Sequence, residues 1–200
     1  MKKLLLFGAV LVMLLVAGCT GQQQNGTQQT TVTPAPLTYA KGFSMTDPAA
    51  ANDTVTFTEH VNDSGQGPAD YTARLTLLEV LRGTAAYDKI TKSYPAYLIN
   101  IQPDREFMAV HFRYELTATS KSGISRLVNR DSFAIYRDGK ADPEDNKYII
   151  GATPDLYGKA KSGDVVDGWF AFTVPKGASW PMVVYGKQSA GSGGIWFRTN

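Results

Sequence analysis

Cysteine and histidine are scarce in this sequence, and their scarcity excludes several kinds of chemistry. The 200 residues contain one cysteine, Cys19, and two histidines, His60 and His111. A single cysteine excludes an intramolecular disulfide and a zinc site built from several thiolates. No serine stands in a nucleophile-elbow context, and the glycine-rich stretches have no phosphate-loop lysine. The composition therefore disfavours an enzyme, and we expect no cofactor, no metal centre and no catalytic residue.

The longest apolar run, from Leu4 to Ala17, is too short to cross a bilayer, which requires about 20 residues. Two lysines precede it and Gly18 follows, a layout that predicts an export signal over residues 1–18. The sequence "LVAGC", residues 15–19, resembles the lipobox of secreted lipoproteins. That resemblance implies cleavage before Cys19 and a diacylglycerol on its thiol, at the outer face of the cytoplasmic membrane. The alternative is an ordinary signal with an incidental cysteine.

An excess of either charge is also absent. Removing residues 1–18 takes away two of the 20 basic residues and no acidic one, which leaves 18 of each sign. A neutral chain lacks the positive surface of a nucleic-acid binder or of a protein recruited to anionic headgroups. We therefore expect no nucleic-acid partner, and contact with the membrane only through the lipid on Cys19.

Residues 19–40 contain no charged side chain and are rich in Gln, Thr, Gly and Pro. Such a segment buries too little apolar surface to offset the entropy lost on ordering, so we expect a flexible tether. No internal repeat or second linker divides the remainder. Residues 41–200 are thus predicted to form one domain with one core.

Period-two alternation dominates this domain and predicts strands rather than helices. In residues 105–118, five apolar side chains alternate with polar ones, which places the apolar set on one buried face: Met108, Val110, Phe112, Tyr114 and Leu116. Further strands are predicted at 54–61, 71–83, 131–137, 167–174, 180–186 and 194–199. In the second of these, Leu78 and Val80 are out of phase with the earlier residues, which indicates a bulge near Leu77.

One short helix is predicted, over residues 84–92. About seven short strands with Gly and Pro between them favour an all-β, antiparallel sandwich, because a βαβ fold needs repeated helices of ten or more residues.

Several stretches of the chain carry a family resemblance: "EVLRGTAAYDKI", "PDREFMAVHFRYEL", "DSFAIYRDG", "GDVVDGWFAFTVPKG", "PMVVYG" and "GIWFRTN". In this order they resemble the small immunoglobulin-like domains of unknown function found in exported bacterial and archaeal lipoproteins. The resemblance covers roughly residues 70–200. It implies an immunoglobulin-like β-sandwich in which Phe170, Phe172 and Val174 form the inner face of a central strand that ends at Pro175. It supplies no catalytic residues.

Few residues are candidates for a site. His111 shares the polar face of its strand with Arg113 and Glu115, which favours a solvated or ion-paired surface residue over a general base with an orienting companion. Trp169 and Trp196 are candidate anchors for a protein or glycan partner if they share one outer face. The alternative is that a loop or the N-terminal segment covers them.

Two further groups of residues carry weaker signals. The loop from 137 to 147 holds oxygen ligands suited to a hard cation, although a charged hairpin turn explains the same residues; these are Asp138, Asp142, Glu144 and Asp145. Three Asn-X-Ser/Thr sequons allow N-glycosylation or arise by chance; they lie at Asn25, Asn52 and Asn62.

The sequence favours a non-catalytic binding or interaction module on the cell surface, with an unidentified protein or glycan as its ligand. Two alternatives stay open. One is a hydrolase of envelope polymers with His60 or His111 as its base, and the other is an accessory subunit of a membrane complex.

Overall fold

The computed structural model describes residues 40–63, 65, 67–95, 101–141, 143–147, 149–186 and 193–200. The chain divides into two units, residues 1–37 and 38–200, and all described residues belong to the second. The predictions at Cys19 and Asn25, for the export signal and for most of the tether lie outside the described residues. Within these ranges, the helices are too short or too polar to cross a membrane.

Eleven strands make up most of the described chain. They are β1 (Thr54–Asp63), β2 (Gly67–Arg82), β3 (Arg105–Thr119), β4 (Arg126–Asn129), β5 (Phe133–Arg137), β6 (Lys140–Ala141), β7 (Ile150–Ala152), β8 (Tyr157–Ala160), β9 (Val165–Pro175), β10 (Met182–Tyr185) and β11 (Ile195–Arg198). The helices are α1 (Thr84–Thr91) and α2 (Pro143–Lys147), with a 3₁₀ turn η2 (Arg130–Ser132).

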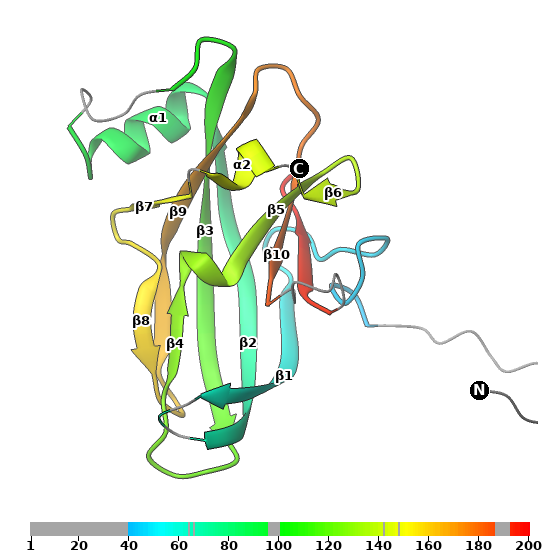
Figure 1. Cartoon of the computed structure of the whole chain (residues 1–200), viewed down its shortest axis with the longest axis vertical. Coiled ribbons are helices and arrows are strands. Elements are labelled where there is room, and N and C mark those ends of the chain that lie inside the picture. The colour runs from blue at the N-terminus through cyan, green and yellow to red at the C-terminus, as the bar shows by residue number, and fades with distance from the viewer. Residues whose placement is uncertain are drawn as a thin grey trace, which may run out of the picture. The chain divides into compact units, whose positions relative to one another are not determined.

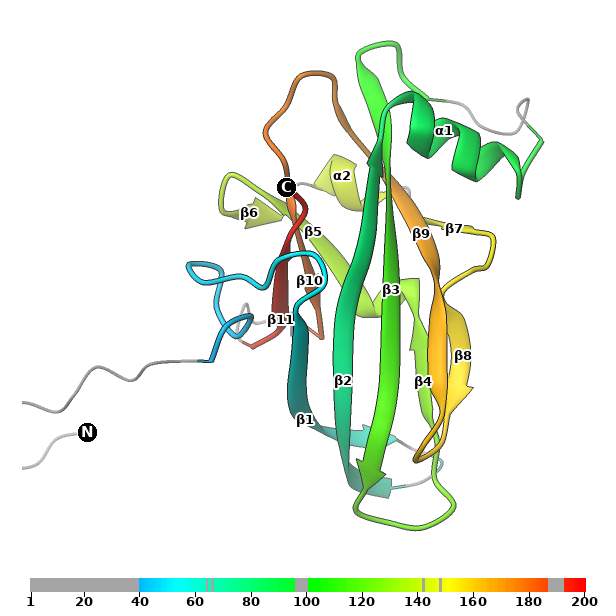
Figure 2. The same cartoon turned by 180° about the vertical axis from the view of Figure 1, so that it is seen from behind.

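The strands form three antiparallel sheets. The largest has the order β1-β2-β3-β9-β7, the second β11-β10-β5-β6, and the third pairs β4 with β8. Figure 2 shows β1, β2, β3 and β9 side by side, and Figure 1 shows β5 and β10 from the opposite side. The prediction of an all-β, antiparallel architecture is confirmed.

The core lies on the inner face of the five-stranded sheet. The five alternating apolar residues predicted on β3 are all completely buried, and so are Phe170, Phe172 and Val174 on β9. The rings of Phe112 and Phe170 stack with centroids 5.9 Å apart. The strand β9 ends at Pro175, as predicted from its missing amide hydrogen.

Helix α1 covers part of the outer face of this sheet. It follows Gly83 and buries Ala86 and Ile90 against outward side chains of the strands, including Trp169 and Ala171. Figure 2 shows the helix beside the upper ends of β2 and β3. Strand β9 is therefore buried on both faces near this end, although its neighbour β3 keeps a polar outer face further down.

The predicted bulge in β2 is present. The pairing of β2 with β3 shifts between Leu77, which faces Phe112, and Glu79, which faces His111. A second shift, between Thr72 and Ala73, has no counterpart in the sequence prediction. Leu78 is the extra residue at the shift between Leu77 and Glu79.

Residue 168 in β9 has no room for a side chain, because residues 154–156 run directly against it. A Cβ atom there would lie 2.5 Å from the carbonyl carbon of Asp155 and from the amide nitrogen of Leu156. The same approach allows the amide of Trp169 to donate to the carbonyl of Pro154 at 2.7 Å. Glycine at this position thus fixes the path of the chain beside Trp169.

Candidate functional site

A groove of about 310 Å³ lies on the outer face of the five-stranded sheet. The residues that line it come from three neighbouring strands, β1, β2 and β3, and they are Thr54, Arg74, Thr76, Leu78, Arg113 and Glu115. The side chains that alternate with them, such as Leu75, Leu77 and Phe112, are completely buried. The groove is therefore the solvent side of a sheet whose other side is fixed in the core.

Leu78 gives the groove one apolar wall. It follows Leu77, which points into the core, and it shares its side of β2 with Arg74 and Thr76 by ordinary alternation. Leu78 has no partner on β3, and the bulge at this point returns Val80 to the core side of the strand. An apolar residue in the polar phase of the strand is thus the sequence signal for the groove.

The polar groups of the groove are arranged in pairs across the strands. The hydroxyls of Thr54 and Thr76 are hydrogen-bonded at 2.8 Å. Nη1 of Arg74 lies 3.7 Å from Oε2 of Glu115, which is an ion pair but too long for a hydrogen bond. Nε of Arg113 donates to Oδ2 of Asp167, in β9, at 2.9 Å.

His111 has partners on the neighbouring strand β9, which corrects the expectation that it has no orienting companion. Its Nε2 lies 2.6 Å from Oδ1 of Asp167, and its ring stacks on Trp169 with centroids 4.6 Å apart and planes 13° apart. Only 20% of the side chain is exposed. His111 is thus held by a carboxylate, an orienting partner that the sequence did not reveal.

Asp167 joins His111 and Arg113 into one cluster beside the groove. Burial opposes its ionisation, but the hydrogen bonds from His111 and Arg113 outweigh burial and hold the pKa of this carboxyl below its usual range. Both of its oxygens face these two donors. The carboxylate therefore fixes the positions of the imidazole and of the Arg113 guanidinium.

The two tryptophans do not share an outer face, so the condition under which they would anchor a partner is not met. Trp169 lies in the five-stranded sheet and Trp196 in the four-stranded sheet, and each is about 5% exposed. His111 stacks on Trp169, and Nζ of Lys89 from α1 lies 4.3 Å from its ring centroid. Both rings are too well covered to anchor a partner in this conformation.

The segment before β1 pairs through its backbone with the second tryptophan. The backbone amide of Trp196 donates to the carbonyl of Gly42 at 2.7 Å, and its carbonyl accepts from the amide of Ala49 at 2.8 Å. The indole ring of Trp196 packs edge-on against the ring of Tyr136.

The other histidine and the described sequons are on the surface. Nδ1 of His60 lies 2.7 Å from Oδ1 of Asp70, and both side chains are more than half exposed. Asn52 and Asn62 are exposed as well. Asn52 has a positive φ of 68° in the turn before β1, a conformation that asparagine tolerates.

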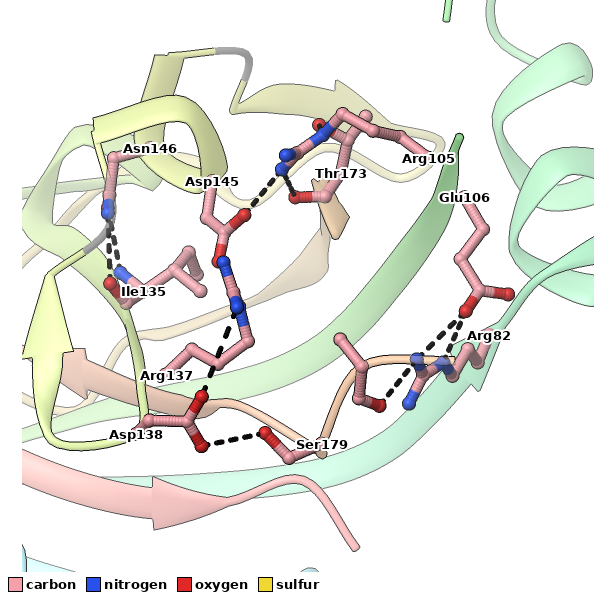
Figure 3. Close-up of polar contacts among 11 residues, drawn as sticks. Arg82, Arg105, Glu106, Ile135, Arg137, Asp138, Asp145, Asn146, Thr173 and Ser179 are labelled. Carbon is pink, nitrogen blue, oxygen red and sulfur yellow. Dashed lines mark hydrogen bonds and ion pairs between the residues drawn. The ribbon is translucent and has the colours of Figure 1, made fainter. Parts of the chain in front are cut away.

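The acidic loop is not assembled as a cation site in the described residues, and the interpretation of its residues as solvated is wrong for Asp145. Asp145 is completely buried and ion-paired with Arg105 and Arg137. Figure 3 shows its carboxylate between the two guanidinium groups. Asp138 instead accepts from Ser179 at 3.0 Å.

The remaining acidic residues of the loop do not form a cation site with Asp138 or Asp145 either, as far as the structure describes them. Glu144 is ion-paired with Lys147 on the same helix, and Asp142 lies outside the described residues. Across the described ranges, no three His, Cys, Asp or Glu side chains are placed to hold a metal ion together.

Comparisons with known proteins add little. No protein-family model matches the chain, and no curated protein matches it. Among solved structures, the crystal structure of the yjhA protein from Bacillus subtilis aligns with 76% of this chain and 99% of that chain, at 14% identity and a TM-score of 0.41. A likeness this distant says nothing about function, and the family resemblance drawn from the sequence stays a prediction.

Proposed function

We propose that this protein is a lipid-anchored binding module of the cell surface, with an immunoglobulin-like sandwich domain that holds its ligand in the groove on β1, β2 and β3. The observation that carries the proposal is the groove itself. Hydrogen-bonding side chains from three strands surround one apolar side chain there, on a rigid sheet. Polar groups held in fixed positions orient a ligand and supply specificity in binding sites.

The rigidity of the sheet favours binding. The side chains behind the groove are completely buried in the core, so the backbone that carries Arg74, Thr76 and Arg113 has little freedom. The guanidinium side chains of Arg74 and Arg113 are 53% and 55% exposed. Their N–H donors therefore reach solvent from a backbone that is held in place, and a ligand loses little affinity to reorganisation of the site.

The anchor rests on the sequence around Cys19 and has its own test. Cys19→Ser removes the thiol that would carry the lipid, so we expect the variant to leave the membrane fraction or to remain an uncleaved precursor. Immunoblots of membrane and soluble fractions measure both outcomes. A variant that stays in the membrane fraction at the mature size would contradict lipidation.

The binding role is tested by photo-crosslinking from the groove in intact cells. Thr56 is exposed and faces Arg74 across the β1–β2 pair, so a photo-crosslinking amino acid at position 56 lies at the rim of the groove. Lys159, exposed on β8, gives a matched control position away from this face. We expect a product from position 56 that is absent from position 159. Equal products from both positions, or none from position 56, would contradict the proposal.

Hydrolysis of an envelope polymer is the second candidate function, and one observation favours it. Asp167 holds His111 in a fixed orientation, which is the arrangement a general base requires. Replacing both His60 and His111 with Gln separates the two candidates in a deletion strain. A binding module retains function at normal surface abundance, whereas a hydrolase that uses either ring as a base loses it.

A further inference from the structure

Where the structure describes it, the groove has more hydrogen-bond donors without a partner, on its two arginines, than carboxylates to receive them. A guanidinium carries five N–H donors, and the guanidinium of Arg74 makes no hydrogen bond within the described part of the chain, since Glu115 is 3.7 Å away. Among the described residues, the guanidinium of Arg113 bonds only through Nε, to Asp167, which leaves the four N–H donors of its two Nη atoms. Glu115 is the one carboxylate in the lining, against two guanidinium groups. Such a surface is complementary to a ligand that supplies acceptors.

The geometry of the guanidinium donors indicates which acceptor group the ligand carries. Their planar fork matches the two oxygens of a carboxylate, and such bidentate pairs are roughly twice as strong as neutral hydrogen bonds. The Arg74–Glu115 pair does not compete strongly, because both side chains are exposed, at 53% and 37%, and exposed ion pairs contribute little. A ligand carboxylate can therefore engage Arg74 at little cost.

The rest of the lining suits a sugar ring. The hydroxyls of Thr54 and Thr76 and the carboxylate of Glu115 can exchange hydrogen bonds with ligand hydroxyls. Leu78 supplies an apolar surface for the C–H face of a ring. The volume of about 310 Å³ is at the lower end of the range for ligand pockets, about 300–1,000 Å³, which limits the ligand to one or two ring-sized units.

We infer that the groove binds an acidic sugar, with the sugar carboxylate on Arg74 and Arg113 and the ring against Leu78. This inference rests on the proposed function, since it names the ligand class of the same groove. The groove is open to solvent along the sheet, so the sugar can belong to a longer chain.

The test is a calorimetric titration of the full-length lipoprotein in detergent micelles. The probe is a trimer of galacturonic acid, and the matched neutral probe is the same trimer with its carboxyl groups reduced to alcohols. We expect the acidic trimer to bind at least about tenfold more tightly, a ratio that decreases as salt is added. Equal affinity for the two trimers, or binding of neither, would overturn the inference.

Variants locate the binding in the groove. Arg74→Gln is expected to weaken binding of the acidic trimer by about tenfold, and Arg74→Lys to restore part of it, because Lys keeps the charge but not the fork. Arg130→Gln is the control: its guanidinium, in η2, is also partly exposed and ion-paired with a carboxylate, that of Asp155. We expect it to bind like the wild type. Unchanged binding in Arg74→Gln, with the fold intact by circular dichroism, would also overturn the inference.

The two proposals fail separately. If the neutral trimer binds as tightly as the acidic one, and Arg74→Gln weakens both, the ligand class is wrong and the binding groove stands. If neither trimer binds, the ligand class is again wrong, and crosslinking from position 56 decides whether the groove binds anything.

Discussion

Phe172→Ala tests whether β9 lies where the core requires it. Phe172 is completely buried, faces Met108 across the β3–β9 pair and lies 6.4 Å from the ring of Phe170. Truncation removes most of a large aromatic side chain and leaves a cavity between the layers. From the range for buried aromatics we expect a loss of about 3 to 5 kcal/mol in the free energy of unfolding.

Chemical denaturation measures this loss, and thermal unfolding gives an independent value. For a chain of this size, each kcal/mol lowers the melting temperature by roughly 2–4 °C, so we expect a decrease of about 6–20 °C. Val165→Ala, on the same strand but 51% exposed, is the matched control and should change stability by about 0.5 kcal/mol or less.

A third variant keeps the test decisive if Phe172→Ala does not fold. Phe172→Leu fills most of the same volume and should cost about 1.5 kcal/mol or less. A loss under about 1 kcal/mol for Phe172→Ala, or equal losses for it and Val165→Ala, would show that this face of β9 is not in the core.

Three further predictions follow from the packing and the charges. Gly168→Ala places a Cβ 2.5 Å from backbone atoms of Asp155 that cannot rotate away, so thermal unfolding should show a loss of about 1–3 kcal/mol; wild-type stability would contradict the close approach. Asp145→Asn leaves two guanidinium groups facing an uncharged amide in a buried site, and urea titration should show a loss of about 3–5 kcal/mol, whereas a change near zero would mean that water reaches this site. Because the pKa of Asp167 is lowered in the folded state, its contribution to stability is present above pH 4 and decreases as the pH falls further. The difference in stability between the wild type and Asp167→Asn should therefore shrink between pH 5 and pH 2, and a constant difference would refute the role of the charge.

The longest strands could be predicted because their patterns are local. On β3, alternation over residues 105–118 identifies the buried face without any knowledge of the partner strands. The strands β4, β6, β7 and β8 contain two to four residues each and were missed. The strands β10 and β11 are equally short, at four residues each, but they were predicted because apolar runs between Gly- and Pro-containing turns mark them. The positions of the four missed strands depend on pairings with distant segments, and a single sequence does not reveal these.

The cluster beside the groove shows the same limit. The polar face of His111 and Arg113 is visible in the sequence, but the carboxylate that joins them lies more than 50 residues further along the chain. Only the register of β3 against β9, which sets Arg113 opposite Asp167, brings it there. Trp169 was misjudged for a related reason, because helix α1 covers an outer face that alternation alone assigns to solvent.

A side chain whose polarity does not match the face of the strand on which alternation places it is an informative signal in a sequence, and β1 contains one. In β1, Glu59 is in phase with Val55 and Phe57, so it must point between the sheets. A carboxylate in that position requires partners, and it accepts hydrogen bonds from Arg126 and from Tyr185.

The consequences of this inward carboxylate extend to its neighbours. Burial and the nearby charge of Glu59 raise the pKa of Tyr185 well above its usual value, so the phenol is still a neutral donor at the pH where a free tyrosine ionises. Glu59 thereby ties strands of three different sheets, β1, β4 and β10, into one polar contact. Leu78 is the opposite case, an apolar side chain that alternation with Leu75 and Leu77 places on a polar face. Both residues have the wrong polarity for their phase in the sequence, and in each case the position on the strand, rather than the polarity of the side chain, decides its environment.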